Sequence, residues 1–129
     1  FFIIINMAKA IPIFRIFDYK KAIDHYIGWM EFKIDWESYL DEGSPVYMQI
    51  SKDDLVLHLS EHSGDCSPGA RIYIENYTGL AAYHQLLIDK KYKYNRPGIG
   101  ESYWVKGVIE METIDPFGNK MTFTEKNTL

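Results

Sequence analysis

Few residues in this chain have the types and spacing that catalysis requires. The single cysteine, Cys66, cannot form an internal disulfide and has no partner at metal-ligand spacing. The sequence contains no Gly-rich phosphate loop and no serine-nucleophile motif, and no base accompanies the cysteine. An acidic cluster could attract a cation, and a solvated loop explains it equally well; its members are Asp35, Glu37, Asp41 and Glu42.

Aromatic side chains are the more informative group. They make up 16% of the residues, and flat rings form walls on which a planar or cationic molecule can stack without any chemical step. Gly98 and Gly100 belong to a predicted flexible loop that leads to Tyr103 and Trp104. A mobile segment that carries these two rings could close over a bound ligand.

Length and charge limit the possible partners. A chain of 129 residues suffices for one domain with a real core. The 14 basic and 18 acidic residues give a net charge of -4, which argues against nucleic acid as a partner. The same charge suits a cationic small molecule, although a mildly acidic balance is common among proteins.

The first residues are apolar but too few to cross a membrane. Residues 1 to 6 fall far short of the ~20 residues of a spanning helix and lack a basic flank and a cleavage-like site, so we expect no membrane partner. We interpret residues 1 to 9 as an N-terminal extension whose first six residues are an upstream or artificial addition. An edge strand or an oligomer contact is the alternative. The lone cysteine favours a reducing, cytoplasmic location.

Residues 10 to 60 predict a strand, a helix and three further strands. The first strand covers residues 10–17, and the helix follows the N-cap Asp18 and stops at Gly28. The remaining strands cover residues 30–36, 45–50 and 54–60. We expect four aromatic residues in the core, namely Phe14, Trp29, Phe32 and Phe123. On the helices, we expect His25 and His84 to face solvent.

Residues 70 to 125 repeat this plan. A strand covers residues 70–75, Thr78 caps a helix, and Lys90 and Lys91 complement the dipole at its C-terminus. A short extended piece near residues 92–94 then leads to a hairpin of strands 108–114 and 120–125. The hairpin turn is Asp115-Pro116-Phe117-Gly118-Asn119.

These patterns predict an α+β fold of two βαβββ modules with curved mixed sheets. The modules cover residues 10–60 and 70–125 of a single domain, residues 10–125, which is followed by a tail of residues 126–129. Pairing the two curved sheets leaves a concave face between them.

Four segments in this order resemble the vicinal oxygen chelate superfamily, and within it the glyoxalase and bleomycin-resistance branch. They are residues 11–18 (IPIFRIFD), 24–32 (DHYIGWMEF), 55–60 (LVLHLS) and 115–123 (DPFGNKMTF). The order and spacing match across residues 10–125. The resemblance implies the glyoxalase/bleomycin resistance/dioxygenase fold.

Metal-dependent members of this superfamily bind a divalent ion through His and Glu side chains on four strands. By resemblance, the four positions fall on Ile11, His58, Arg71 and Thr122. One imidazole beside an aliphatic chain, a cation and a hydroxyl cannot supply the roughly three donors that a catalytic ion needs. We therefore expect no metal, no cofactor and no catalytic residue. A divalent-metal lyase, isomerase or dioxygenase of the same superfamily is the alternative.

The metal-free branch implies a homodimer that traps an antibiotic in grooves between its subunits, without turnover. Trp36 and Tyr47 fall where drug-binding relatives place stacking rings, and His58 could donate a hydrogen bond beside them. Trp104, next to Tyr103, lies where relatives carry another ring, about three residues earlier than in their pattern. We predict that these five residues bind a small aromatic or cationic molecule, such as a bleomycin-type antibiotic. A core role for Trp36, Tyr47 and His58 is an equal alternative.

Overall fold

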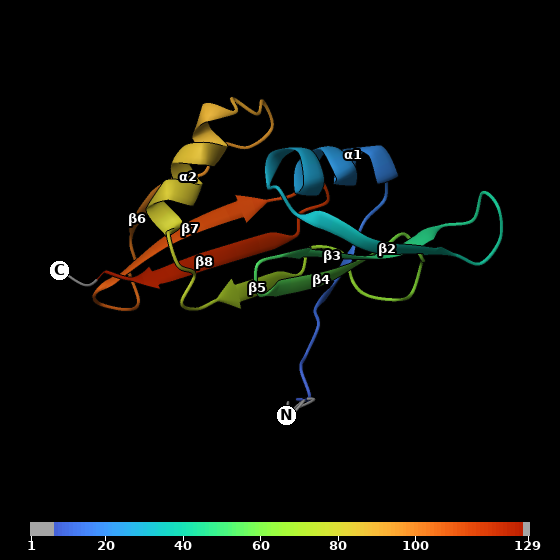
Figure 1. Cartoon of the computed structure of the whole chain (residues 1–129), viewed down its shortest axis with the longest axis horizontal. Helices are drawn as coiled ribbons and strands as arrows, with labels where there is room; N and C mark the ends of the chain where they lie inside the picture. Colours follow the sequence, from blue (N-terminus) through green and yellow to red (C-terminus); the bar gives the residue numbers. More distant parts are fainter. Residues whose placement is uncertain (1–6, 128–129) are drawn as a thin grey trace, which may run out of the picture.

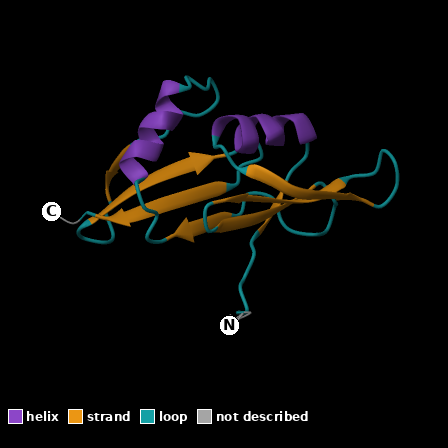
Figure 2. Ribbon diagram, viewed as in Figure 1, coloured by secondary structure: helices purple, strands orange, loops and turns teal. Residues whose placement is uncertain are grey.

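The computed structural model describes residues 7 to 127 of the chain. Two four-stranded sheets lie side by side, and the helices cover the same side of both (Figure 1, Figure 2). Residues 1 to 6, interpreted above as an addition, lie outside the described residues, and so does the end of the tail, residues 128–129. No helix within residues 7–127 is long and apolar enough to cross a membrane.

The two modules have the same strand order. The first contains β1 (Ile13–Arg15), α1 (Tyr19–Ile23), the π-helix η1 (Asp24–Trp29), β2 (Lys33–Tyr39), β3 (Val46–Lys52) and β4 (Leu55–Ser60). The second contains β5 (Arg71–Ile74), α2 (Leu80–Asp89), β6 (Ile99–Glu101), β7 (Val108–Ile114) and β8 (Lys120–Lys126). The sheet orders are β1-β4-β3-β2 and β5-β8-β7-β6, with β1 parallel to β4, β5 parallel to β8 and the other pairs antiparallel. The predicted α+β fold with two βαβββ units is confirmed.

Alternation along the strands separates two faces of the first sheet. Met48, Ile50, Leu57 and Leu59 are buried on the face that the helices cover. The alternate residues Tyr47, Gln49, Val56 and His58 are less buried and point to the opposite side, which we call the open face. The four aromatic residues expected in the core are all buried, which confirms that expectation; they are Phe14, Trp29, Phe32 and Phe123.

The ends of the helices match the prediction in one place and differ from it in two. Asp18 caps α1 as predicted, because its Oδ1 accepts a hydrogen bond from the Lys21 amide (3.0 Å). The helix does not stop at Gly28 but widens into η1, which continues to Trp29. Thr78 is not the cap of α2, because the carboxylate of Glu125 accepts from the amides of Gly79 and Leu80 (2.9 and 3.0 Å). A negative charge at this end also suits the helix dipole.

Lys90 acts on the other module rather than on its own helix. Its Nζ donates to the carbonyls of Gly28 (3.0 Å) and Trp29 (2.8 Å) and forms an ion pair with Glu31 (2.9 Å). The predicted stabilisation at the end of α2 is therefore replaced by a cap on the end of η1.

The strand expected near residues 92–94 is wrong. The segment there has no regular structure, because Tyr92 stacks on Trp29 with ring centroids 4.9 Å apart instead of joining a sheet. The fourth strand of the second module is β6, where Ile99 and Gly100 pair with Met111 and Glu110. The predicted loop of residues 95–101 thus ends in a strand, because its last three residues form β6.

The predicted hairpin turn joins β7 to β8 and also joins the two modules. Asp115 Oδ2 accepts from the hydroxyl of Tyr26 (2.7 Å) and from Nδ2 of Asn119 (2.8 Å), and Oδ1 accepts from the amides of Phe117 and Asn119 (2.9 and 2.8 Å). Asn119 Nδ2 also donates to the carbonyl of Arg15 (2.9 Å). Asp115 and Asn119 are buried, so this network lies between the modules and away from water.

Three further contacts between the modules involve aromatic side chains. Trp29 Nε1 donates to the Leu87 carbonyl (3.1 Å), and the Tyr83 hydroxyl donates to the Met30 carbonyl (2.8 Å). Lys52 lies over the ring of Tyr83, with its Nζ 4.6 Å from the centroid. The buried residues of both halves form one core cluster.

We predict that the Asp115→Ala variant loses about 2–4 kcal/mol of unfolding free energy, because two side-chain and two backbone donors lose their acceptor in a buried position. Urea unfolding followed by circular dichroism measures the change. The exposed Asp54 gives a matched control, since Asp54→Ala should stay within about 0.5 kcal/mol of the wild type. Equal losses in the two variants would contradict the importance of the buried network.

His25 is buried, contrary to the expectation that it faces solvent. Only 1% of the residue is exposed, and its ring lies beside those of Tyr26, Trp29 and Tyr92. The position three residues after Ala22 and four before Trp29 places it on the buried stripe of the helix. Burial lowers the pKa of His25 to about 3. The expectation for His84 is also wrong, because this residue is half-buried and its Nε2 donates to the Pro97 carbonyl (2.8 Å).

His25 makes the stability of the protein depend on pH. Below its ordinary pKa of 6.5 the unfolded chain binds a proton at this residue, whereas the folded chain does not until the pH approaches 3. The free energy of unfolding therefore falls as the pH falls from 6.5 towards 3, by up to about 1.4 kcal/mol per pH unit. We expect the wild type to lose about 2 kcal/mol more than His25→Phe between pH 7 and pH 5. Urea unfolding at the two pH values tests this, and parallel losses in both proteins would contradict it.

Candidate functional site

Three aromatic rings meet on the open face of the first sheet. Trp36 from β2 stacks on Tyr47 from β3, with centroids 6.1 Å apart and an interplanar angle of 13°. The His58 ring from β4 meets both at a steep angle, 5.3 Å from Trp36 and 5.2 Å from Tyr47. Trp36 remains 42% exposed, so its ring is available for further stacking. The structure thus brings together three of the five predicted site residues, and we call them the ring cluster.

A β-bulge places Trp36 in the ring cluster. The register of β2 against β3 shifts between Ile34, opposite Ile50, and Trp36, opposite Gln49. Asp35 is the extra residue. Its carboxylate reaches the side chains of Gln49 and Ser51 on the open face. Without the bulge, simple alternation would send Trp36 and Asp35 to opposite faces.

A chain of hydrogen bonds fixes the polar groups of the ring cluster. Asp35 Oδ2 accepts from Gln49 Nε2 (3.0 Å), which turns the amide oxygen of Gln49 towards His58 Nε2 (3.0 Å). His58 Nε2 must then carry the proton, and its Nδ1 accepts from the Tyr47 hydroxyl (2.8 Å). All three side chains are held in one orientation.

The same network sets the charge of the site. The hydrogen bond from Gln49 lowers the pKa of Asp35, and burial lowers the pKa of His58. Burial also raises the pKa of the Tyr47 phenol. At neutral pH the site therefore combines a carboxylate with an uncharged imidazole and an uncharged phenol. This arrangement suits a planar ligand that carries a positive charge.

Tyr103 and Trp104 do not join the ring cluster within one chain. They lie in the loop between β6 and β7, at the opposite end of the molecule from the β2–β3 hairpin (Figure 1). Tyr103 is 95% exposed and Trp104 is 89% exposed. The buried hydroxyl of Ser102 accepts from the amides of Trp104 and Val105 (both 3.2 Å), which holds the loop in a defined turn.

The second sheet repeats the geometry with different chemistry. Thr122 pairs with Glu112 as His58 pairs with Gln49 in the first sheet. Glu112 Oε2 accepts from Arg71 Nη2 (2.7 Å) and from the Thr122 hydroxyl (3.3 Å). Arg71 and Thr122, two of the four metal-ligand positions of the resemblance, thus converge on Glu112.

The donor set does not fit a divalent ion. Both nitrogens of His58 are engaged by Tyr47 and Gln49, and the carboxylate of Glu112 is paired with the cation of Arg71. The fourth position, Ile11, offers no donor. Across residues 7–127, no group of three His, Cys, Asp or Glu side chains could hold a metal ion.

Sequence reasoning did not identify Gln49 and Glu112 as parts of the site. The alternation of β3 and β7 could have placed them on the open face, because Gln49 shares its face with Tyr47. The role of Asp35 has a weaker signal in the sequence, because the bulge that turns it towards Gln49 is a tertiary feature. The sequence shows Asp35 only as one member of an acidic cluster.

We predict that His58 is neutral at pH 7 with its proton on Nε2, since Gln49 and Asp35 fix this tautomer and burial lowers the pKa. Two-dimensional 15N–1H spectra of the imidazole report the tautomer, and a pH titration reports the pKa. In Asp35→Asn the Gln49 amide is no longer held in one orientation, so both tautomers should appear. A proton on Nδ1 in the wild type would contradict this assignment.

Comparisons with known proteins agree with this fold. A family model described as "Glyoxalase superfamily protein" matches residues 1–128. A search of curated protein sequences found no match to the chain.

Many solved structures share the fold. A bleomycin resistance determinant encoded on the transposon Tn5 has a TM-score of 0.68 at 17% identity, over 95% of this chain and 100% of that chain. A bleomycin-binding protein in complex with bleomycin has a TM-score of 0.66 at 18% identity, over 93% and 99%. An antibiotic-binding protein from Streptomyces sp. CB03234 has a TM-score of 0.66 at 19% identity, over 94% and 99%. At these identities the likeness is one of fold.

Proposed function

The chain belongs to the glyoxalase superfamily, and from this premise we propose that it binds and sequesters a small aromatic or cationic molecule without turnover. A bleomycin-type antibiotic is the leading candidate ligand. The observation that carries the proposal is the ring cluster of Trp36, Tyr47 and His58 on the open face, with the Asp35 carboxylate beside it.

The chemistry of the ring cluster favours binding over catalysis. A general base or a metal ligand needs a lone pair that is available to the substrate or the ion. The imidazole of His58 has a partner at each nitrogen, and the Asp35 carboxylate accepts from Gln49 and Ser51. The exposed face of Trp36 and the negative charge of Asp35 serve stacking and charge recognition.

Relatives with the same fold support the choice of ligand. The structure of one bleomycin-binding protein contains bleomycin, and another relative is described as an antibiotic-binding protein. A molecule with flat aromatic rings and a cationic end matches what the ring cluster offers.

We also propose that two copies of the chain complete the site. Trp36 on the open face and Trp104 in the β6–β7 loop are both exposed. The β6–β7 loop lies at the opposite end of the molecule from the β2–β3 hairpin (Figure 1). Isolated monomers seldom leave a surface rich in aromatic side chains exposed to solvent. We propose a two-fold dimer in which the loop of each chain lies at the ring cluster of the other; symmetry then forms this contact twice.

A calorimetric titration with metal-free bleomycin tests the proposal. We expect one ligand per chain, and Trp36→Leu and Trp104→Leu should each weaken binding about tenfold or more, since each removes a stacking ring. Leu86→Ala is the control, because Leu86 is exposed on α2 and its loss should leave the affinity unchanged. No binding by the wild type would refute bleomycin as the ligand.

Mixed dimers test the shared site. When Trp36→Leu and Trp104→Leu chains are combined, each heterodimer contains one site with both tryptophans and one site with neither. Half of the sites in such heterodimers should therefore recover wild-type affinity. Light scattering should give the mass of a dimer. A monomer, or a heterodimer without recovery, would contradict a site shared between chains.

A further inference from the structure

A hollow lies on the helical side of the molecule, across the first sheet from the ring cluster. It is a groove of about 780 Å³ between the helix α1–η1, the segment after α2 and the end of β7. His25 lines it from the helix, Tyr92 and Tyr94 from the segment, and Ile114 from the hairpin. Its volume lies within the range of small-molecule sites.

The imidazole of His25 is the first feature that points to a ligand. Neither of its ring nitrogens has a hydrogen-bond partner among residues 7–127, although the residue is 1% exposed. A neutral imidazole has one donor and one acceptor, and a buried polar group without a partner is costly and rare in folded proteins. A ligand with a complementary heteroatom would supply a partner.

Aromatic rings form the wall of the groove. Tyr92 stacks on Trp29 with centroids 4.9 Å apart, and Tyr94 meets Tyr92 edge-on at 5.5 Å. The segment that carries them is irregular, but Asn95 Nδ2 donates to the Ile114 carbonyl (2.6 Å) and so ties it to the hairpin. Tyr94 itself is exposed, so its ring has an uncovered surface for stacking.

The charges at the rim leave two cations without partners. Asp24 is paired with Lys20 (3.0 Å), and Asp18 is used as the cap of α1. The buried Asp115 accepts its four hydrogen bonds from Tyr26, Phe117 and Asn119. Among the described residues, the side chains of two other groove residues, Lys21 and Arg96, form no hydrogen bond or ion pair. They could bind an anionic group, and the planar guanidinium suits a carboxylate.

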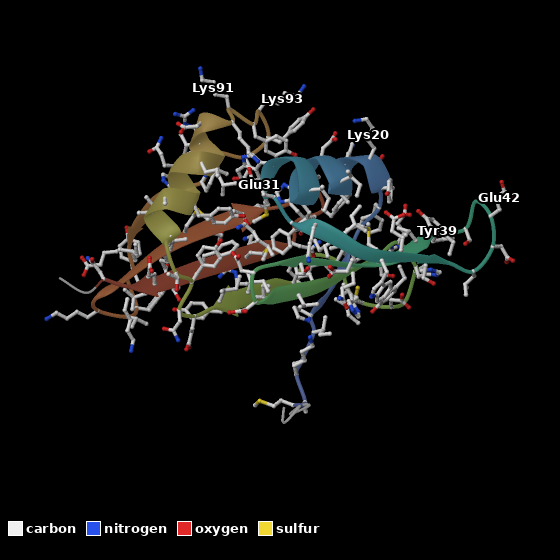
Figure 3. The ribbon with its side chains drawn as sticks, viewed as in Figure 1. Lys20, Glu31, Tyr39, Glu42, Lys91 and Lys93 are labelled. Atoms are coloured by element: carbon white, nitrogen blue, oxygen red, sulfur yellow. The ribbon has the colours of Figure 1, made fainter. Side chains whose placement is uncertain are left out.

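The view with side chains shows where the helical side lies relative to the β2–β3 hairpin. Lys20 projects from α1 and Lys93 from the turn beside it, both on the helical side of the molecule (Figure 3). Tyr39 and Glu42 lie on the distant β2–β3 hairpin (Figure 3). None of the residues of the ring cluster lines the groove, so the two are separate surfaces.

We propose that this groove is a second ligand site, which binds a small planar heteroaromatic carboxylate. The ring of the ligand packs against Tyr92 and Tyr94, its heteroatom forms a hydrogen bond with His25, and its carboxylate pairs with Arg96 and Lys21. The Tyr92 ring lies 6.0 Å from that of His25, and the imidazole is closed off from solvent, so the segment of Tyr92 must shift outward when the ligand enters. The inference is independent of the proposed bleomycin site.

Three matched probes test the site. Quinoline-6-carboxylate has the ring nitrogen and the charge, naphthalene-2-carboxylate lacks the nitrogen, and quinoline-6-carboxamide lacks the charge. In 15N–1H titrations of the full chain, we expect the first probe to shift the amides of Tyr94, Asn95 and Ile114. Loss of either feature should weaken binding about tenfold, as expected for one hydrogen bond or one ion pair.

Variants assign each interaction to a residue. His25→Phe preserves the shape of the ring and should abolish the difference between the quinoline and naphthalene acids. The double variant Lys21→Gln and Arg96→Gln should abolish the difference between the acid and the amide. Leu40→Ala, at an exposed position of the distant β2–β3 hairpin, is the control and should bind all three probes as the wild type does. The amide spectrum of each variant verifies that it is folded.

The outcomes separate cleanly. Preference for quinoline-6-carboxylate that is lost selectively in these variants supports the site. The proposal is overturned if the wild type shows no shifts at the groove, if it binds the three probes equally, or if His25→Phe retains the preference for the ring nitrogen.

Discussion

The buried carboxylate of Asp115 is the interaction on which the arrangement of the two modules depends. It accepts four hydrogen bonds, from the turn in which it lies and from Tyr26 of the other module. Asn119 extends this network to the backbone of β1. A buried carboxylate is stable only when such donors surround it, so the closing hairpin and the first helix have to meet in one geometry. The cap that Lys90 places on η1 strengthens the same contact between the two modules.

Two surfaces with different chemistry result from this packing. Because both helices lie on one side of the sheets, the other side is left for the ring cluster, where a bulge at Asp35 and the hydrogen bonds through Gln49 orient Trp36, Tyr47 and His58. On the helical side, the helix α1–η1 and the end of β7, which the Asp115 network joins, line a groove that contains His25. The open face carries a carboxylate beside stacked rings, whereas the groove carries unpartnered cations.

The sequence predicted the repeated architecture well, because its signals are local. Alternating strands, the Asp18 cap and the Asp115–Asn119 turn each depend on a few neighbouring residues, and all are present in the structure. The errors arose where a distant partner decides the conformation. Glu125 replaces Thr78 as the cap of α2, Lys90 caps the other module, and Tyr92 stacks on Trp29 instead of forming a strand. His25 was misplaced although its spacing from Ala22 and Trp29 indicated the buried stripe.

By itself the sequence determined the βαβββ repeat and the aromatic core, because residue identity and spacing suffice for both. That the four positions matched to metal-dependent relatives lack a metal-type donor set also followed from residue identity, once the resemblance supplied those positions. Only the tertiary structure decided how the site residues are grouped. It brought Trp36, Tyr47 and His58 together through a bulge that alternation does not reveal, and it placed the β6–β7 loop, which carries Trp104, at the opposite end of the molecule from the β2–β3 hairpin. It also left the nitrogens of His25 without partners. Such features depend on contacts between residues far apart in the sequence, which local patterns do not specify.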